Sequence, residues 1–178
     1  SDGMYKSLNL ARDQLRTAKD WQDRILPEDL EEYKRCFVRL LKGRRVLVPG
    51  PGDTLTQPGY VEDGVQALVK MMGNRSTFGE AYNVAGPQSV TDSGYVDTLA
   101  GVAGVEPEKV HIPADDMDAV ALRMPYPLTL RISRTNLRWS ENAVCSVQKL
   151  MDHVGYWPRH TLEEGMRRTF EWFQREKM

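Results

Sequence analysis

The chain has 178 residues, of which 40% are hydrophobic and 28% charged, and its formal net charge is −1. This length and balance predict one globular domain, and a charge so near zero gives no overall attraction to polyanions such as nucleic acids. No apolar run approaches the ~18 residues that a membrane span requires, and the polar amino terminus does not resemble a signal peptide. The two cysteines, Cys36 and Cys145, form no CxxC pair, which is typical of reduced thiols in the cytoplasm.

The amino-terminal part of the chain predicts two helices. Residues 4–21 carry spaced leucines and a tryptophan among many charges, which indicates a surface helix. Pro27 and the acidic residues after it predict the start of a second helix, because proline fixes φ and negative charge is favourable at a helix start. Apolar residues then recur at three- and four-residue steps up to Gly43, which predicts the cap of that helix.

Short strands are predicted at residues 45–48, 80–84 and 109–112, where apolar and β-branched residues lie between turn signals. The run PGPGD at 49–53 predicts a turn, since its prolines lack amide donors and its glycines permit positive φ. A loop is expected to follow as far as Gly59.

Five helices are predicted in the rest of the chain. The first carries one apolar stripe and ends at Gly73, and the last begins with a capping box at Thr161. Their expected ranges are 61–72, 91–102, 115–122, 143–154 closed by Gly155, and 161–173. This irregular mixture of strands and helices predicts a mixed α/β fold and not an all-α bundle.

Six segments resemble, in the same order, the NAD-dependent epimerase/dehydratase group of extended short-chain dehydrogenases/reductases. They are FVRLLKGRRVLVPGPGD (37–53), YVED (60–63), YNV (82–84), VT (90–91), VQKL with VGYWP (147–158), and LEEG and the helix after it (162–172). The resemblance implies a partial Rossmann-like fold, mainly the small carboxyl-terminal substrate domain with short strands and several helices. Residues 37–178 are thus expected to form a substrate-binding domain, and residues 1–36 a helical segment that either retains or replaces part of the cofactor domain.

Three departures from the group concern its chemistry. No tyrosine has a lysine four residues later, so the YxxxK pair that transfers protons in classical members is absent. No GxxGxxG or GxGxxG turn is present to cradle a dinucleotide phosphate. Nucleotide-sugar members carry an arginine shortly before the counterpart of Tyr60, where this chain has Gln57, Pro58 and Gly59. NAD(P) is implied by the resemblance, but the chain alone is not expected to bind it or to transfer hydride.

The resemblance implies a site on the substrate-domain side of the cofactor cleft. The candidate substrate-binding residues are Gln57, Tyr60, Asn83 and Arg131, and no catalytic residue is identified. Asp63 would lie near the same cleft, although it also suits a structural role as negative charge in a helix's first turn, and Asn83 could satisfy backbone groups at a strand end. The histidines and cysteines are too scattered to predict a metal site.

Two alternative functions remain open from the residues. Arg131, Arg134 and Arg138 lie beside Trp139, and such a run either binds RNA or forms a solvated face paired with acids. The first outcome would make the chain a cofactor-free RNA-binding protein of the chloroplast stem-loop binding type, which is the part of the group that it resembles most. The second alternative is a repurposed scaffold for isomerisation or cyclisation of a small molecule.

The expected partners follow from the missing cofactor domain. An absent domain would leave apolar faces bare, so a homo-oligomer or a separate cofactor-domain chain is expected beside the small-molecule substrate. The aromatic residues near the end of the chain are expected either to pack in the core or to join such an interface: Trp157, Phe170, Trp172 and Phe173.

Overall fold

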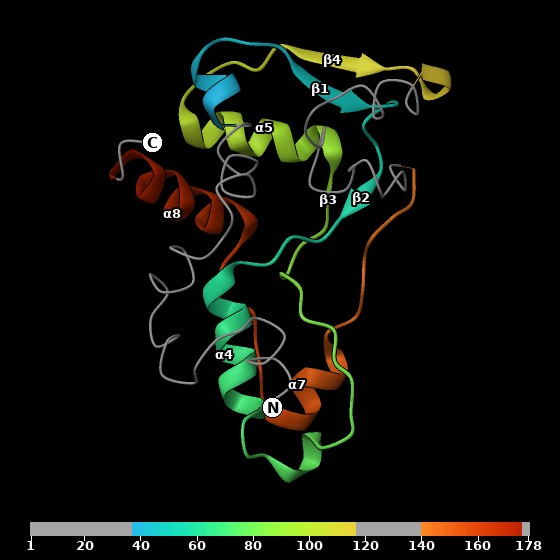
Figure 1. Ribbon diagram of the computed structural model, residues 1–178, viewed down its shortest axis with the longest axis vertical. Helices are drawn as coiled ribbons and strands as arrows, with labels where there is room; N and C mark the ends of the chain where they lie inside the picture. The colour runs from blue at the N-terminus through green and yellow to red at the C-terminus, as the bar shows by residue number, and fades with distance from the viewer. Residues whose placement is uncertain (1–36, 117–139, 176–178) are drawn as a thin grey trace, which may run out of the picture.

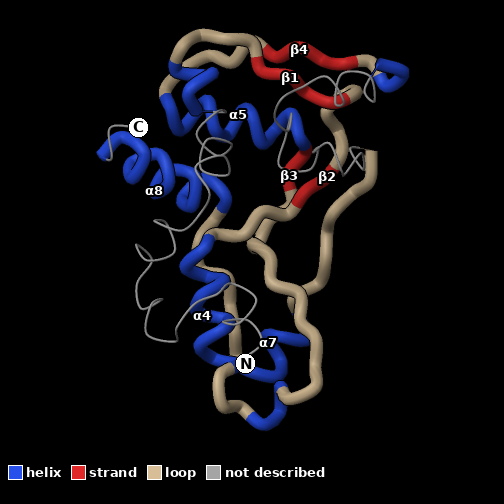
Figure 2. Tube along the Cα trace, viewed as in Figure 1, coloured by secondary structure: helices blue, strands red, loops and turns tan. Residues whose placement is uncertain are grey.

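The structure is a computed structural model that describes residues 37–116 and 140–175. It is a mixed α/β fold in two parts, as the sequence predicted (Figure 1). The first part holds β1 (Val46–Pro49), β4 (Lys109–Ile112), α5 (Asp92–Ala103) and α8 (Leu162–Arg175). The second holds α4 (Val61–Met71), η1 (Arg75–Thr77) and α7 (Gln148–Val154), and β2 (Leu55–Thr56) with β3 (Val90–Thr91) lies where the two parts join (Figure 2).

The described strands form two small sheets. β1 and β4 pair in parallel from Val46 opposite Lys109 to Pro49 opposite Ile112, which confirms the predicted strands at 45–48 and 109–112 within one residue. β2 and β3 pair antiparallel, with Leu55 opposite Thr91. β2 lies in a segment predicted as loop. The prediction was wrong because two residues that gain their hydrogen bonds from a distant segment leave no periodic signal.

The main core lies between the β1–β4 sheet and the two helices α5 and α8, which pack on each other. Phe37 stacks on Phe170 with ring centroids 5.1 Å apart and also lies against Phe173. Phe170 and Phe173 are therefore core residues, whereas Trp157 is 65% exposed. The buried members of this core are Phe37, Leu40, Val46, Val48, Val96, Leu99, Ala100, Met166, Phe170 and Phe173.

The predicted helix boundaries that depend on caps are confirmed. Thr91 Oγ1 accepts a hydrogen bond from the amide of Gly94 at 3.0 Å and starts α5. Thr161 and Glu164 form the predicted capping box, in which each residue's side chain satisfies the other's amide. Gly43 and Gly155 adopt the left-handed conformation that suits a helix end, with φ of 59° and 62°.

Two predictions about the second part were wrong. The helix predicted at 143–154 begins only at Gln148, because Ala143 instead donates its amide to the carbonyl of Leu55 at 2.8 Å and forms a bridge to Thr56. Residues 80–84 are not a strand. Strand pairing needs a neighbour, and no other described strand lies beside this segment.

Several predictions fall on residues that the structure leaves undescribed. They are the helix at 4–21, most of the helix that begins near Pro27, Arg131 with the arginines after it, and most of the helix at 115–122. The described part of this last segment holds the 3-10 turn η2 (Ala114–Asp116).

Candidate functional site

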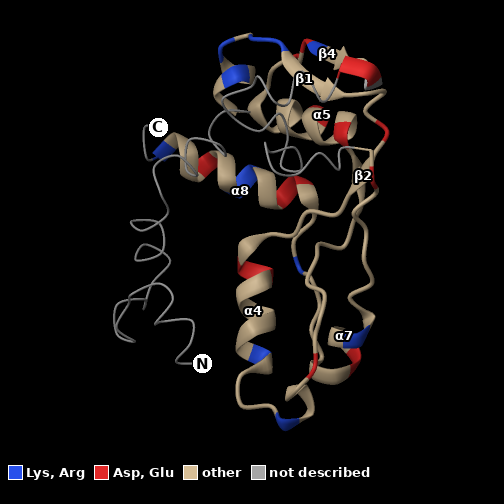
Figure 3. Cartoon of the chain, turned by 45° about the vertical axis from the view of Figure 1, so that its right-hand side comes forward, with Lys and Arg blue, Asp and Glu red and all other residues tan. Residues whose placement is uncertain are grey.

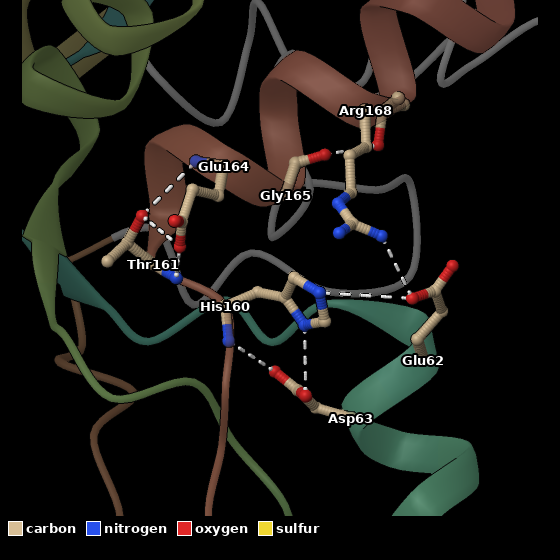
Figure 4. A network of polar contacts seen from close by, with 8 residues as sticks. Glu62, Asp63, His160, Thr161, Glu164, Gly165 and Arg168 are labelled. Atoms are coloured by element: carbon tan, nitrogen blue, oxygen red, sulfur yellow. Dashed lines mark hydrogen bonds and ion pairs between the residues drawn. The ribbon is translucent and has the colours of Figure 1, made fainter.

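Polar side chains converge where the start of α4 meets the residues before and within α8 (Figure 4). Tyr60 is the residue before α4, in extended conformation, and the next two acidic residues occupy the helix's first turn. Glu62 and Asp63 belong there because negative charge is favourable near the unpaired amides of a helix start. From the other side, the segment after Pro158 brings His160, and α8 brings Arg168.

Asp63 is buried and holds His160 at two points. Its Oδ2 accepts from the backbone amide of His160 at 3.1 Å, and its Oδ1 lies 3.0 Å from the ring Nδ1. A carboxylate can only accept, so the ring donates from Nδ1. The pairing joins two residues 97 positions apart and fixes α4 to the segment that leads into α8.

Opposing effects set the pKa of Asp63. Burial raises it, but hydrogen bonds from the backbone amides of His160 and Arg159 and from the His160 ring more than offset burial. The net result is a pKa below the ordinary value of 3.8, so Asp63 is ionised at neutral pH.

Glu62 and Arg168 extend the cluster toward solvent. Arg168 lies 3.2 Å from Glu62 Oε2, and the same oxygen is 3.8 Å from Nε2 of His160. Tyr60 packs its ring 4.8 Å from that of His160 and beside Gly165, with the Arg168 guanidinium 5.9 Å from the ring centre. Burial and the Glu62 carboxylate raise the pKa of Tyr60, and Arg168 opposes them.

This arrangement supports a structural latch better than an acid–base pair. Nδ1 of His160 is committed to Asp63, and Nε2 faces the carboxylate of Glu62. General acid–base catalysis requires a nitrogen within reach of a bound substrate. The nearby hollow is lined by Tyr60 and Tyr156 but not by His160.

That hollow has a volume of about 440 Å³ and lies against α4. It is lined by Gly59, Tyr60, Val61, Gly64, Val65, Leu68, Val84, Ala85 and Tyr156. The lining is apolar apart from the two tyrosines, and the hydroxyl of Tyr156 is buried without a hydrogen-bond partner. An unpaired buried hydroxyl is costly, so it marks a place where a polar group from elsewhere would stabilise the protein.

Gln57 and Asn83 fasten the extended residues 143–147. The Gln57 side chain donates to the carbonyl of Gly86 at 2.8 Å and accepts from the amide of Cys145 at 2.9 Å. Asn83 donates to the carbonyl of Ser146 at 3.3 Å. Both carboxamides therefore satisfy backbone groups, as the sequence suggested for Asn83.

Sequence reasoning found Tyr60 and Asp63 but missed His160 and Arg168. Residues 60–63 carry a recognisable motif, whereas His160 precedes a capping box that accounts for its surroundings without a partner. Only the fold brings these segments together. Arg131, the remaining predicted substrate residue, lies outside the described residues.

Metal and membrane sites were also sought in the described residues. Over 37–116 and 140–175, no three His, Cys, Asp or Glu side chains converge in a way that could hold a metal ion. Among the helices of the same ranges, none combines the length and apolar character needed to cross a bilayer.

Three curated proteins with related sequences were compared with the chain. Over 131 residues it is 29% identical to the chloroplast stem-loop binding protein of 41 kDa b of Arabidopsis thaliana, which corresponds to 73% of this chain and 32% of that protein. It is 26% identical to the dTDP-glucose 4,6-dehydratase of Neisseria gonorrhoeae, over 88% of this chain and 42% of the dehydratase. The chain thus spans about a third to two fifths of these relatives. No model of a known protein family matches the sequence.

Solved structures give the same fold. The UDP-glucose 4-epimerase of Thermotoga maritima superposes with a TM-score of 0.61 at 21% identity, over 81% of this chain and 39% of the epimerase. An epimerase of Methanothermobacter thermautotrophicus gives a TM-score of 0.64 at 19% identity, over 82% of this chain and 38% of its own. In sequence and in fold, the chain belongs to the NAD-dependent epimerase/dehydratase group of extended short-chain dehydrogenases/reductases.

Proposed function

We propose that this chain is the substrate-binding part of an NAD(P)-dependent epimerase/dehydratase/reductase-like protein and does not transfer hydride on its own. The observation that carries the proposal is that its glycine turn has spent its amides within the fold. The amide of Gly50 donates to the carbonyl of Ile112 at 2.8 Å, and that of Gly52 donates to Pro49 at 3.0 Å. A dinucleotide pyrophosphate needs free amides at a glycine turn that opens a helix, whereas this turn leads from β1 into β2.

The helix starts support the same conclusion. Each of the three longer described helices carries acidic residues in its first turn: Glu62 and Asp63 in α4, Asp92 in α5, and Glu163 and Glu164 in α8. Carboxylates at these positions use the favourable field of the helix start and repel a phosphate. The described residues therefore offer no favourable helix start for a dinucleotide.

The substrate would lie near the loop before α4. We propose that residues 37–178 form the substrate-binding domain and that Gln57, Tyr60, Asn83 and Arg131 border the substrate, a small organic molecule. Tyr60 is suited to direct contact because it lines the hollow. The carboxamides of Gln57 and Asn83 would act by holding residues 143–147 in place.

Calorimetric titration of the purified chain with NADH tests the proposal. We expect no saturable heat up to millimolar NADH, since the glycine-turn amides are already bonded. The UDP-glucuronic acid 4-epimerase of Bacillus cereus, whose crystal structures contain NAD, is the positive control in the same buffer. Binding of NADH to this chain with a micromolar dissociation constant would show that it carries its own cofactor site and would end the proposal.

A second candidate function, RNA binding, is favoured by the 29% identity to a stem-loop binding protein. Its proposed contact residues are Arg131 and Arg134, with Trp139 as a stacking platform. Under this function the chain is retained on a polynucleotide column at low salt, and retention falls with added salt and in the variant Arg131→Ala with Arg134→Ala. A chain that passes through the column at low salt would rule RNA binding out.

A further inference from the structure

Helix α4 has an apolar stripe that no described residue covers. Its other side is held in the second core, where Ala67 is fully buried against Leu150 and Tyr156. Between its acidic first turn and its basic last turn the helix carries no charge (Figure 3). A helix that is apolar on two sides normally lies between two layers. The exposed members of the stripe are Val61 (69%), Val65 (52%), Leu68 (59%), Val69 (61%) and Met72 (78%).

An open strand-like segment lies beside this stripe. Residues 81–85 form no backbone–backbone hydrogen bond with any described residue, and Val84 is 43% exposed. Val84 and Ala85 line the hollow together with α4, so the segment and the stripe share one face. Unpaired backbone beside an apolar helix has the form of an αβ unit without the rest of its sheet.

Two further features indicate that another backbone approaches this face. Gly64 lies inside α4 and lines the hollow, yet a Cβ added to it would meet nothing within 4 Å. Glycine weakens a helix, so its presence is explained if an external backbone comes close at that point. The buried hydroxyl of Tyr156 has no partner, which calls for a polar group in the hollow.

We propose that this surface is the docking site for the cofactor-binding α/β half of the fold, supplied by a separate polypeptide. The surface, named here the α4 face, consists of the α4 stripe and residues 81–85. A strand of the partner would pair with residues 81–85, the partner's sheet would cover the stripe, and one of its polar groups would reach Tyr156.

The choice of occupant follows from what the α4 face lacks. A second copy of the chain would bring its own apolar stripe but no polar group for the Tyr156 hydroxyl. The matched relatives contain 58% to 68% of their length beyond the part that this chain spans, which is enough for a complete α/β half. In naming the partner, the inference rests on the proposed function.

The test is co-expression of the full chain with a probe, namely the part of the Neisseria gonorrhoeae dTDP-glucose 4,6-dehydratase outside its match to this chain. We expect a 1:1 complex in sedimentation velocity. The variant Val65→Glu with Leu68→Glu should weaken the complex at least a hundredfold. Gly64→Ala should weaken it at least tenfold and yet raise the melting temperature of the chain alone. Lys70→Glu, on the charged side of the same helix, is the matched control and should leave the complex intact.

Three results would overturn the proposal. One is the absence of any complex with the probe. Another is a dimer of the chain alone that the Val65→Glu and Leu68→Glu variant dissociates, since a second copy would then be the occupant. The third is a lower melting temperature of that variant alone, which would mean that the chain fills the face itself. The readout is mass and not cofactor binding, so NADH binding by the chain alone would refute the proposed function without altering this result.

Discussion

Replacing Gly86 by alanine is expected to lower the free energy of unfolding by about 3 kcal/mol, the upper range for overpacking a tight site. A Cβ at this position would overlap the carbonyl oxygen of Pro58 and lie 3.4 Å from the Cα of Gly59. These are backbone atoms, which cannot move aside as the end of a flexible side chain could. The two segments are also tied together by the 2.8 Å hydrogen bond from Gln57 to the carbonyl of Gly86.

Gly101→Ala is the matched control for this prediction. Gly101 lies inside α5, and a Cβ there would meet nothing within 4 Å. Because alanine favours a helix more than glycine does, this substitution should raise the free energy of unfolding by about 1 kcal/mol. Urea denaturation of both variants measures the two effects. If Gly86→Ala also unfolded at or above the wild-type midpoint, the close approach of residues 58–59 to Gly86 would be wrong.

Signals that act within a few residues could be interpreted from the sequence. The capping box of Thr161 and Glu164 and the N-cap of Thr91 lie where they were predicted, because each depends on a partner only three residues away. The glycine ends at Gly43 and Gly155 were found for the same reason. These local rules give the helix boundaries of most of the described fold.

Features that depend on distant partners could not be predicted. Residues 80–84 have the composition of a strand, but a strand forms only beside another, and none is adjacent in the described residues. The reverse error occurred at 143–147, where a helical pattern is overridden by pairing with residues 55–56. The apolar stripe of α4 was predicted correctly, yet periodicity alone does not say whether such a stripe is covered.

The candidate site shows the same division. Tyr60 and Asp63 lie in a recognisable motif, and Asp63 was expected to serve the first turn of its helix. The structure adds what the motif could not provide, because the partner of Asp63 is His160, 97 residues later. Gln57 and Asn83 were also selected from the sequence, but the atoms that they bind lie on the carboxyl-terminal side of the undescribed residues 117–139.

Asp63→Ala is expected to lower the free energy of unfolding by about 3 kcal/mol at pH 7, because it leaves the backbone amide and ring nitrogen of His160 without their acceptor in a buried place. Asp97→Ala is the control. Asp97 also forms an ion pair, 2.8 Å from Lys109, but its side chain is 54% exposed, so its removal should cost at most about 1 kcal/mol. Equal losses in the two variants would contradict the latch between α4 and the segment before α8.

The same carboxylate gives a pH dependence whose sign is fixed. The folded-state pKa of Asp63 lies below the ordinary 3.8, so the folded state favours the ionised form. Its contribution to stability is present above about pH 5 and is lost as the pH falls through 3.8 and then through the lower folded-state value. Urea denaturation between pH 6 and pH 3 should therefore show a steeper loss for the wild type than for Asp63→Asn. Glu80 and Glu164, whose pKa values are also lowered, are present in both proteins, so the difference between the two curves isolates Asp63. Parallel curves would mean that this carboxylate has the same pKa in the folded and unfolded chain, and the network around His160 would then contribute nothing to acid stability.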